Sequence, residues 1–123
     1  MAWVKRNFRL TRSTDFKRVR RFGKSYAHPF IVLVALPAEG ERTLIGVSAG
    51  RSVGSAVDRN RAKRLIREAI RPFLPALQPG WNILLLARKP ILQAQFTEIQ
   101  SSLQTLLTRG QILNGNNERP ATA

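Results

Sequence analysis

The sequence contains no cysteine, a single histidine and few acidic residues, with only seven Asp and Glu among 123 residues. Without cysteine the chain has no disulfide bond, no thiolate metal ligand and no cysteine nucleophile, which is compatible with a reducing compartment. No apolar run approaches the roughly 20 residues that a membrane-spanning helix requires. The N-terminal stretch MAWVKRNFRLTR is basic but lacks a long apolar segment and a cleavage site, so we do not expect a secretory signal.

Positive charge is the feature that the chain has in excess. Its 21 Lys and Arg residues give a formal net charge of +14, and self-repulsion at that level destabilises a compact domain unless a polyanion compensates. Because 43% of the residues are hydrophobic, the composition favours a folded protein over a basic disordered tail. We expect one domain over residues 1–108 and a polar, disordered tail over residues 109–123. Nucleic acid is the first partner to consider, and an anionic membrane surface is the second.

Turn residues and hydrophobic periodicity divide the chain into helices and strands. Strands are predicted over residues 30–36, 43–48 and 81–87, and helices over residues 13–22, 55–71 and 95–107. The second strand is expected to pair antiparallel with the first across a turn at residues 37–41. Pro72 and Pro75 are expected to stop the long helix. The apolar face of the last helix is predicted to consist of Phe96, Ile99, Leu103, Leu106 and Leu107.

This order of elements predicts an α+β fold in which helices pack on a sheet. The path from the second strand through the long helix to the strand at residues 81–87 can form a βαβ crossover. Such crossovers are usually right-handed, and the residue pattern alone does not determine the hand of this one.

The stretch DRNRAKRLIREAIR, residues 58–71, separates charge from apolar residues when it is wound at about 100° per residue. Its apolar side is predicted to carry Ala62, Leu65, Ile66, Ala69, Ile70 and the following Phe73. Its basic side carries Arg59, Asn60, Lys63, Arg64, Arg67 and Arg71, and Arg61 lies on the far flank beside Glu68. A solvated helix face usually mixes signs, whereas Arg59, Lys63 and Arg67 are like charges at i,i+4 spacing. We therefore interpret this side as a polyanion-binding face.

A second basic block covers residues 1–24, where Asp15 is the one acidic residue. The block is interleaved with four aromatic residues: Trp3, Phe8, Phe16 and Phe22. Aromatic side chains beside cations can stack on unpaired bases, which is a common way to hold single-stranded nucleic acid. For each of them taken alone, packing in the core is the competing interpretation.

Independent catalytic chemistry is not indicated. His28 has no acidic neighbour in the sequence, so a structural or RNA-contacting role is favoured over general-base catalysis. The carboxylates are scattered, with Asp58 and Glu68 among cations, and no pair resembles the metal site of a nuclease. Ser48 and Ser52 lack a base partner. We predict no catalytic residue and no metal site on the protein itself.

Four segments in order resemble one known family. RNRAKRLIRE at residues 59–68, the preceding GSAVD, RLTRSTDFKRVRRFGKS at residues 9–25 and ILLLARKP at residues 83–90 resemble the bacterial ribonuclease P protein subunit over about residues 6–108. The resemblance implies the accessory subunit of a cytoplasmic ribonucleoprotein that removes the 5′ leader of precursor tRNA. The catalyst would be its RNA subunit, which carries Mg²⁺. The implied fold is an α/β sandwich with three helices, a mixed sheet of about four strands and a left-handed βαβ crossover, like the second domain of a ribosomal protein of the small subunit.

The resemblance also implies which residues bind RNA. Contact with the catalytic RNA is expected from the long helix and the loop before it: Arg59, Asn60, Arg61, Lys63, Arg64, Arg67 and Arg51. A cleft between the sheet and the first helix is expected to hold the single-stranded leader through Arg9, Arg12, Phe16, Lys17 and Arg20. Two positions depart from the family, which often has aromatic residues where this chain has Arg20 and Val34. Leader contact is therefore expected to depend less on stacking and more on charge.

Three other functions stay open at this point. A ribosomal or general RNA-binding protein would share the charge and would not stimulate precursor-tRNA cleavage. A cationic membrane-surface protein is disfavoured because the core needs the apolar face of the long helix. A protein-only nuclease would cut without added RNA, and it lacks an evident metal-ligand cluster. The oligomeric state is left undetermined by the sequence.

Overall fold

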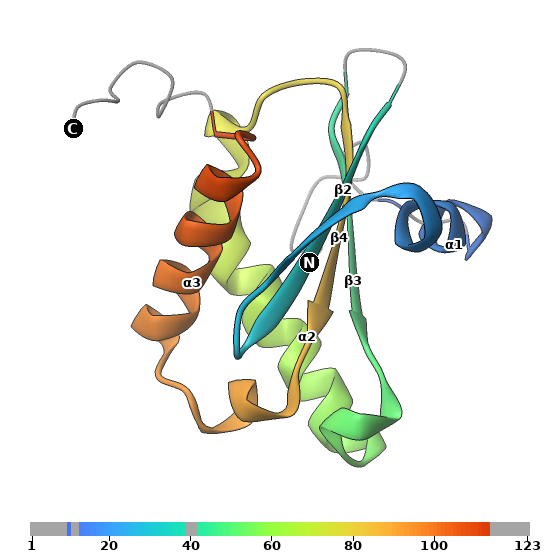
Figure 1. Cartoon of the computed structure of the whole chain (residues 1–123). Helices are drawn as coiled ribbons and strands as arrows, with labels where there is room; N and C mark the ends of the chain where they lie inside the picture. The colour runs from blue at the N-terminus through green and yellow to red at the C-terminus, as the bar shows by residue number, and fades with distance from the viewer. Residues whose placement is uncertain (1–9, 11–12, 39–41, 114–123) are drawn as a thin grey trace.

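The computed structural model describes Leu10, residues 13–38 and residues 42–113 (Figure 1). None of the helices in these segments is long and apolar enough to cross a membrane. The elements follow one another as α1 (Ser13–Phe22), β1 (Lys24–Ala27), β2 (Ile31–Pro37), β3 (Leu44–Ala49), η2 (Arg51–Val53), α2 (Ala56–Ile70), η3 (Arg71–Ala76), β4 (Trp81–Ala87), η4 (Lys89–Gln93) and α3 (Phe96–Arg109). The η elements are short 3₁₀ helices.

The sheet has the strand order β1-β2-β4-β3. Strand β2 is antiparallel to both of its neighbours, and β3 is parallel to β4. The predicted antiparallel pairing of segment 43–48 with segment 30–36 is therefore wrong, because β4 lies between them. Strand β4 is apolar on both faces, and Ile83, Leu84 and Leu85 are all buried, so burial favours the centre of the sheet for it. The hydrophobic pattern does not predict β1, whose sequence KSYA is short and largely exposed.

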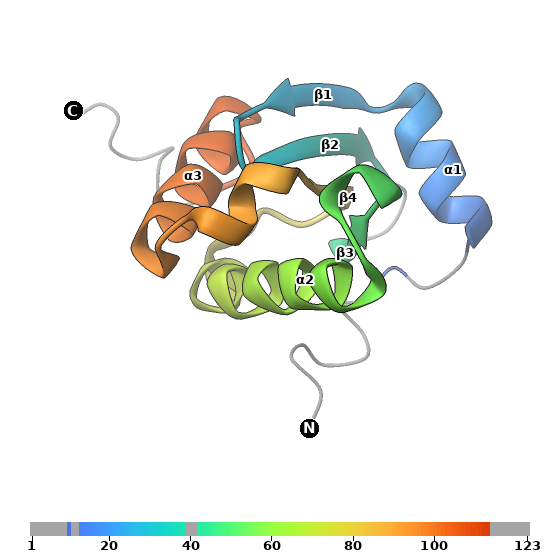
Figure 2. The same ribbon diagram turned by 90° about the horizontal axis from the view of Figure 1, so that it is seen from below.

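Helices cover both faces of the sheet. Helix α1 lies on one face, and α2 and α3 lie on the other (Figure 1 and Figure 2). Alternate residues of each strand serve the two layers, so that in β2 Leu33 belongs to the core under α2 and α3, while Val34 belongs to the core under α1. Because helices cover both faces of the sheet, both faces of β2 and β4 are apolar, and each strand is a continuous apolar run in the sequence.

Strand β3, helix α2 and strand β4 form the βαβ crossover. When the strands point upward and α2 lies in front of the sheet, the chain passes from β3 on the right to β4 on the left (Figure 1 and Figure 2). The crossover is left-handed, against the usual preference. The expected fold, a sandwich of three helices on a mixed sheet of four strands, is thereby confirmed.

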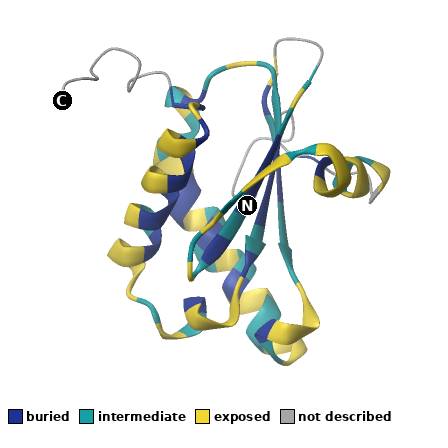
Figure 3. Cartoon of the chain, viewed as in Figure 1, coloured by how far each residue is buried: buried dark blue, intermediate teal, exposed yellow. Residues whose placement is uncertain are grey.

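The buried sides of α2 and α3 face the sheet, as the colours of Figure 3 show. In α3 the predicted apolar residues Ile99, Leu103, Leu106 and Leu107 are fully buried. Phe96 was also expected on this buried side, but it is 41% exposed. It is the first residue of the helix, where the side chain points back beyond the helix N-terminus rather than onto the core.

The ends of two predicted helices can now be compared with the structure. The long α-helix ends at Ile70, before Pro72 as predicted, and the chain then continues through Pro72 and Pro75 as the 3₁₀ helix η3. The polar tail predicted from residue 109 begins too early, since α3 includes Arg109 and the core includes Ile112 and Leu113. A backbone hydrogen bond holds the segment after α3 in place, because the Gln78 amide donates to the Ile112 carbonyl at 2.6 Å. Residues 114–123 lie outside the described part.

Candidate nucleic-acid interface

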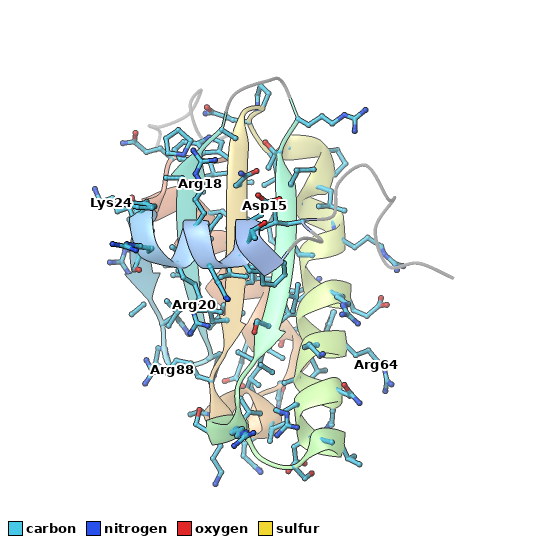
Figure 4. The ribbon with its side chains drawn as sticks, turned by 90° about the vertical axis from the view of Figure 1, so that its right-hand side faces the viewer. Asp15, Arg18, Arg20, Lys24, Arg64 and Arg88 are labelled. Carbon is cyan, nitrogen blue, oxygen red and sulfur yellow. The ribbon has the colours of Figure 1, made fainter. Side chains whose placement is uncertain are left out.

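Helix α2 presents the basic side that its sequence predicts. Ala62, Ile66, Ala69 and Ile70 are buried against the sheet. On the outer side, Asn60, Arg61 and Arg64 are exposed, whereas Arg59, Lys63 and Arg67 are half-buried. Figure 4 shows Arg64 directed away from the sheet into solvent. The helix therefore packs through one side and exposes cations on the other.

The acidic residues of α2 are engaged elsewhere. Asp58 forms a capping box, in which the Ser55 amide donates to its Oδ2 and its own amide donates to Ser55 Oγ, both at 3.2 Å. Glu68 accepts from Arg71 Nη2 at 3.4 Å. Within the described residues, Arg61, Lys63 and Arg64 form no hydrogen bond or ion pair, so this part of the chain leaves their positive charge uncompensated. Such a face favours a polyanion.

The loop before α2 extends this basic side. Val53 of η2 is fully buried, which anchors the loop, and Arg51 is exposed at its start. The Arg59 guanidinium donates to the Gly54 carbonyl at 3.0 Å and so connects the loop to the helix. Arg51 thus lies in the same short region as the first turn of α2, as expected for a single RNA-binding surface.

Helix α1 crosses the other face of the sheet over only part of the strands' length (Figure 4). Beneath it the strand register places Ser25, Val34, Leu84 and Gly46 side by side, and Val34 and Leu84 are buried. The Phe16 ring rests on this row, because a Cβ at Gly46 would lie 2.6 Å from Phe16 Cζ. Helix α1 is therefore fixed to the sheet by an aromatic residue seated on a glycine.

The next row across the same face is less covered, and we call it the open row. It consists of Ala27, Val32, Leu86 and Ser48, which are neighbours in the strand register. Ala27 is exposed and the other three are half-buried. Arg20 extends from α1 toward this uncovered part of the sheet (Figure 4). An apolar strip beside an aromatic residue and a cation is a suitable surface for unpaired bases.

A pocket lies where β1 and β4 end, next to the open row. It has a volume of about 320 Å³ and is lined by Ala27, His28, Pro29, Arg88 and Pro90. The Phe30 amide donates to His28 Nδ1 at 3.2 Å, so the histidine holds the turn into β2. Arg88 was not among the RNA-binding residues predicted from the sequence. The basic pair Arg88 and Lys89, which directly follows a buried strand, is a signal that could have indicated a place in an RNA-binding surface.

The outer side of α3 is different in chemistry. Apart from Glu98 of the capping box, its exposed or half-buried residues between the ends are neutral and polar: Thr97, Gln100, Ser101, Gln104, Thr105 and Thr108. The basic residues described above lie on α1, on α2 and at the ends of the sheet instead. The distribution of charge therefore indicates that a polyanion binds on the α1 and α2 sides of the domain.

Comparison with known proteins identifies the family. The family model described as Ribonuclease P matches residues 4–111. A protein of Herpetosiphon aurantiacus named ribonuclease P protein component is 36% identical over 118 residues, which cover 96% of this chain and 95% of the relative. The chain belongs to the ribonuclease P protein family. It therefore has the role of a ribonuclease P protein subunit, and its partner is an RNA subunit.

Further members of the ribonuclease P protein family agree in sequence and in structure. The protein component of Dehalococcoides mccartyi is 34% identical, with 97% of this chain and 98% of the relative covered. The solved Staphylococcus aureus RNase P protein superposes with a TM-score of 0.77 at 29% identity, covering 87% of this chain and 98% of that one. For the Thermotoga maritima RNase P protein the TM-score is 0.73 at 27% identity, with 82% and 96% covered.

The structure places the predicted RNA-binding residues in two separate groups. The α2 group and Arg51 lie together, beyond the β3 edge of the sheet (Figure 2). In the leader group, Phe16 faces the sheet, while Lys17 and Arg20 are exposed on α1. Arg9 and Arg12, which were predicted to join this group, lie outside the described residues. The two groups are thus on different sides of the domain, as separate contacts with two RNAs would require.

The two departures from the ribonuclease P protein family differ in their consequence. Val34 is only 3% exposed beneath α1, so the valine serves packing rather than the open row. Arg20 is exposed and extends toward the open row, so it places a charge where the resemblance led us to expect an aromatic ring. Among the described residues, no group of three or more His, Asp or Glu could hold a metal ion.

Proposed function

We propose that this subunit is an accessory, non-catalytic component that binds both the catalytic RNA and the single-stranded 5′ leader of precursor tRNA. The observation that carries the proposal is the arrangement of two basic surfaces on different sides of one small domain. One is the outer side of α2 with Arg51, and the other is the open row with Phe16, Lys17 and Arg20. With Mg²⁺ bound to it, the RNA supplies the chemistry of hydrolysis in this proposal.

The outer side of α2 suits a folded RNA. Arg61, Lys63 and Arg64 are uncompensated within the described residues, and each can neutralise a phosphate. Neutralisation releases condensed counterions, which makes affinity fall steeply as salt is added. A rigid helix also holds its cations in a fixed pattern, so the surface can bring two phosphate backbones together without repulsion.

The open row suits an unpaired strand. Leu86 and Val32 offer apolar surface to bases, and Phe16 borders the row from α1. Lys17 and Arg20 can contact the phosphates of the same strand. A precursor tRNA has a 5′ leader to place there and a mature tRNA has none, so this contact would favour the precursor and broaden the set of leaders that are accepted.

The accessory role is supported by the placement of the described carboxylates. Asp58 and Glu98 cap the N-termini of α2 and α3, and Glu68 pairs with Arg71. Asp15 lies in the first turn of α1. These residues come from separate places, whereas metal-assisted phosphate hydrolysis requires converging carboxylates. We propose the cytoplasm, where precursor tRNA is processed in bacteria, as the place of action.

The test is cleavage of a 5′-extended precursor tRNA at low Mg²⁺ concentration. Three reactions are compared: the RNA subunit from the same genome alone, the protein alone, and both together. We expect the rate to rise when both are present and the protein alone to leave the substrate intact. Cleavage by the protein alone would overturn the accessory role, and no stimulation of the RNA would overturn the proposed function.

A further inference from the structure

An exposed aromatic residue lies outside both surfaces. Phe22 is the last residue of α1, and it is 64% exposed. Helical spacing places it on the side of α1 that carries Asp15 and Arg18, which lie seven and four residues before it. Figure 4 shows Asp15 and Arg18 on one edge of α1 and Arg20 on the opposite edge. Phe22 therefore faces away from the open row.

Two arginines of α1, Arg18 and Arg21, lie beside Phe22. The Arg21 guanidinium lies over its ring, 5.3 Å from the centroid. Arg18 precedes Phe22 by one turn on the same side of the helix. Lys24 follows after Gly23, but its ammonium lies 5.7 Å from the Tyr26 ring centroid, on the face of the sheet that α3 covers, so it is not part of this group. Within the described residues, Arg18 and Arg21 form no ion pair with a carboxylate.

The backbone holds Phe22 in a fixed place. The Gly23 amide donates to the Val19 carbonyl at 2.8 Å, which closes the last turn of α1. A Cβ at Gly23 would lie 2.6 Å from that carbonyl oxygen and 2.7 Å from Val34 Cγ1, so the chain turns tightly against the sheet immediately after Phe22. The tight turn at Gly23 thus keeps the Phe22 ring exposed to solvent, although burying the ring would stabilise the fold.

We propose that Phe22, with Arg18 and Arg21, forms a second binding site for single-stranded RNA, separate from the open row. An unpaired base stacks on the exposed side of the Phe22 ring, and the adjacent phosphates contact the two arginines. Arg21 covers the ring from one side and strengthens the contact by its own charge. A membrane surface fits less well, because it would require several apolar side chains beside these cations.

This site goes beyond the proposed leader contact, because it lies on the opposite edge of α1 and does not require cleavage activity. It would let one RNA strand cross α1 and be held on both sides, or it would hold a second unpaired strand. Either arrangement uses the same chemistry, which is one stacked base and neighbouring phosphates. The two sites can therefore be tested separately in the same protein.

The experiment is a titration of the ¹⁵N-labelled full chain with a short oligouridylate, followed by backbone amide shifts. We expect the Gly23 and Lys24 amides to shift with one saturation curve, and the Ser48 and Leu86 amides of the open row to shift with their own. Phe22→Ala should weaken the first curve by about tenfold and leave the second within about twofold, as the loss of one stacked base predicts. Phe22→Tyr should bind as the wild type does, and Phe22→Leu, which keeps apolar area without a π face, as the alanine variant does.

Three results would overturn the site. The Gly23 and Lys24 amides could fail to shift at RNA concentrations that move the open row, or throughout the titration. Phe22→Leu could bind like the wild type, which would exclude base stacking on the Phe22 ring as the source of affinity. Phe22→Ala could weaken both curves equally, which would indicate a change in the whole helix. A response at Gly23 and Lys24 without one at the open row would support this site and count against the proposed leader contact, so the two failures are distinguishable.

Discussion

The Phe16 ring lies against Gly46 so closely that a Cβ on this glycine would stand 2.6 Å from Phe16 Cζ. Gly46 therefore leaves the space into which Phe16, the aromatic residue that borders the open row, packs. Because Gly46 belongs to β3 and Phe16 to α1, this contact, together with the buried Val19, limits how close the helix comes to the sheet. It also couples the stability of the fold to the geometry of the proposed leader contact.

Replacing Gly46 by alanine should lower the free energy of unfolding by about 1–3 kcal/mol, since Phe16 must move out of its place. Chemical denaturation of wild type and variant measures the difference. Gly50→Ala is a matched control, because a Cβ at Gly50 meets no atom within 4 Å and its φ of −83° suits any residue. Equal destabilisation by the two substitutions would contradict the role of Gly46.

Removing the Phe16 ring should reduce the preference for precursor over mature tRNA. We expect the ratio of the two affinities to fall by about tenfold in Phe16→Ala, as for the loss of one stacked base. Phe16→Leu serves as a control that keeps apolar contact with β3 and lacks an aromatic face. Binding titrations of the reconstituted ribonucleoprotein with each tRNA give the ratio, and an unchanged ratio in Phe16→Ala would exclude the ring from leader contact.

Arg64→Ala should weaken association with the RNA subunit while leaving the fold intact, because the side chain is exposed and forms no bond within the described residues. If Arg64 contacts one phosphate, the slope of log affinity against log salt should become shallower by about 0.9. Titrations at several salt concentrations measure this slope.

A double variant can show whether RNA affinity depends on where the cations lie or on the net charge of the protein. The double variant with Arg64→Ala and Thr105→Arg keeps the net charge of +14 but moves one cation to the outer side of α3. We expect it to bind the RNA subunit as weakly as Arg64→Ala alone. Recovery of wild-type affinity would mean that total charge, rather than the basic side of α2, determines binding.

Removing the capping residue of α2 should destabilise the protein without altering its basic side. Ser55 Oγ accepts from the Asp58 amide at 3.2 Å, and the loss of such a cap costs about 1 kcal/mol. Thermal or chemical unfolding of Ser55→Ala measures the cost. Ser52→Ala, an exposed serine in η2, is the comparison and should leave the unfolding free energy nearly unchanged.

Local patterns in the sequence determined much of this protein. The helix capped by Ser55, the exact span of β4 and the separation of cations from apolar residues on α2 all depend on residues close together in the chain. Capping, periodicity and turn chemistry act over one or two turns, so they can be read before the fold is known. The basic side of α2 was predictable for the same reason.

Only the tertiary structure decided which strands meet and which surface stays open. Strand β4 enters between β2 and β3 because its two apolar faces gain most from the centre of the sheet, a comparison among strands that no single segment contains. The short, polar β1 is a strand only because β2 offers it an edge. Whether an aromatic residue lies in the core or at a binding surface also depends on packing: Phe16 rests on Gly46, whereas Phe22, six residues later on the same helix, faces solvent.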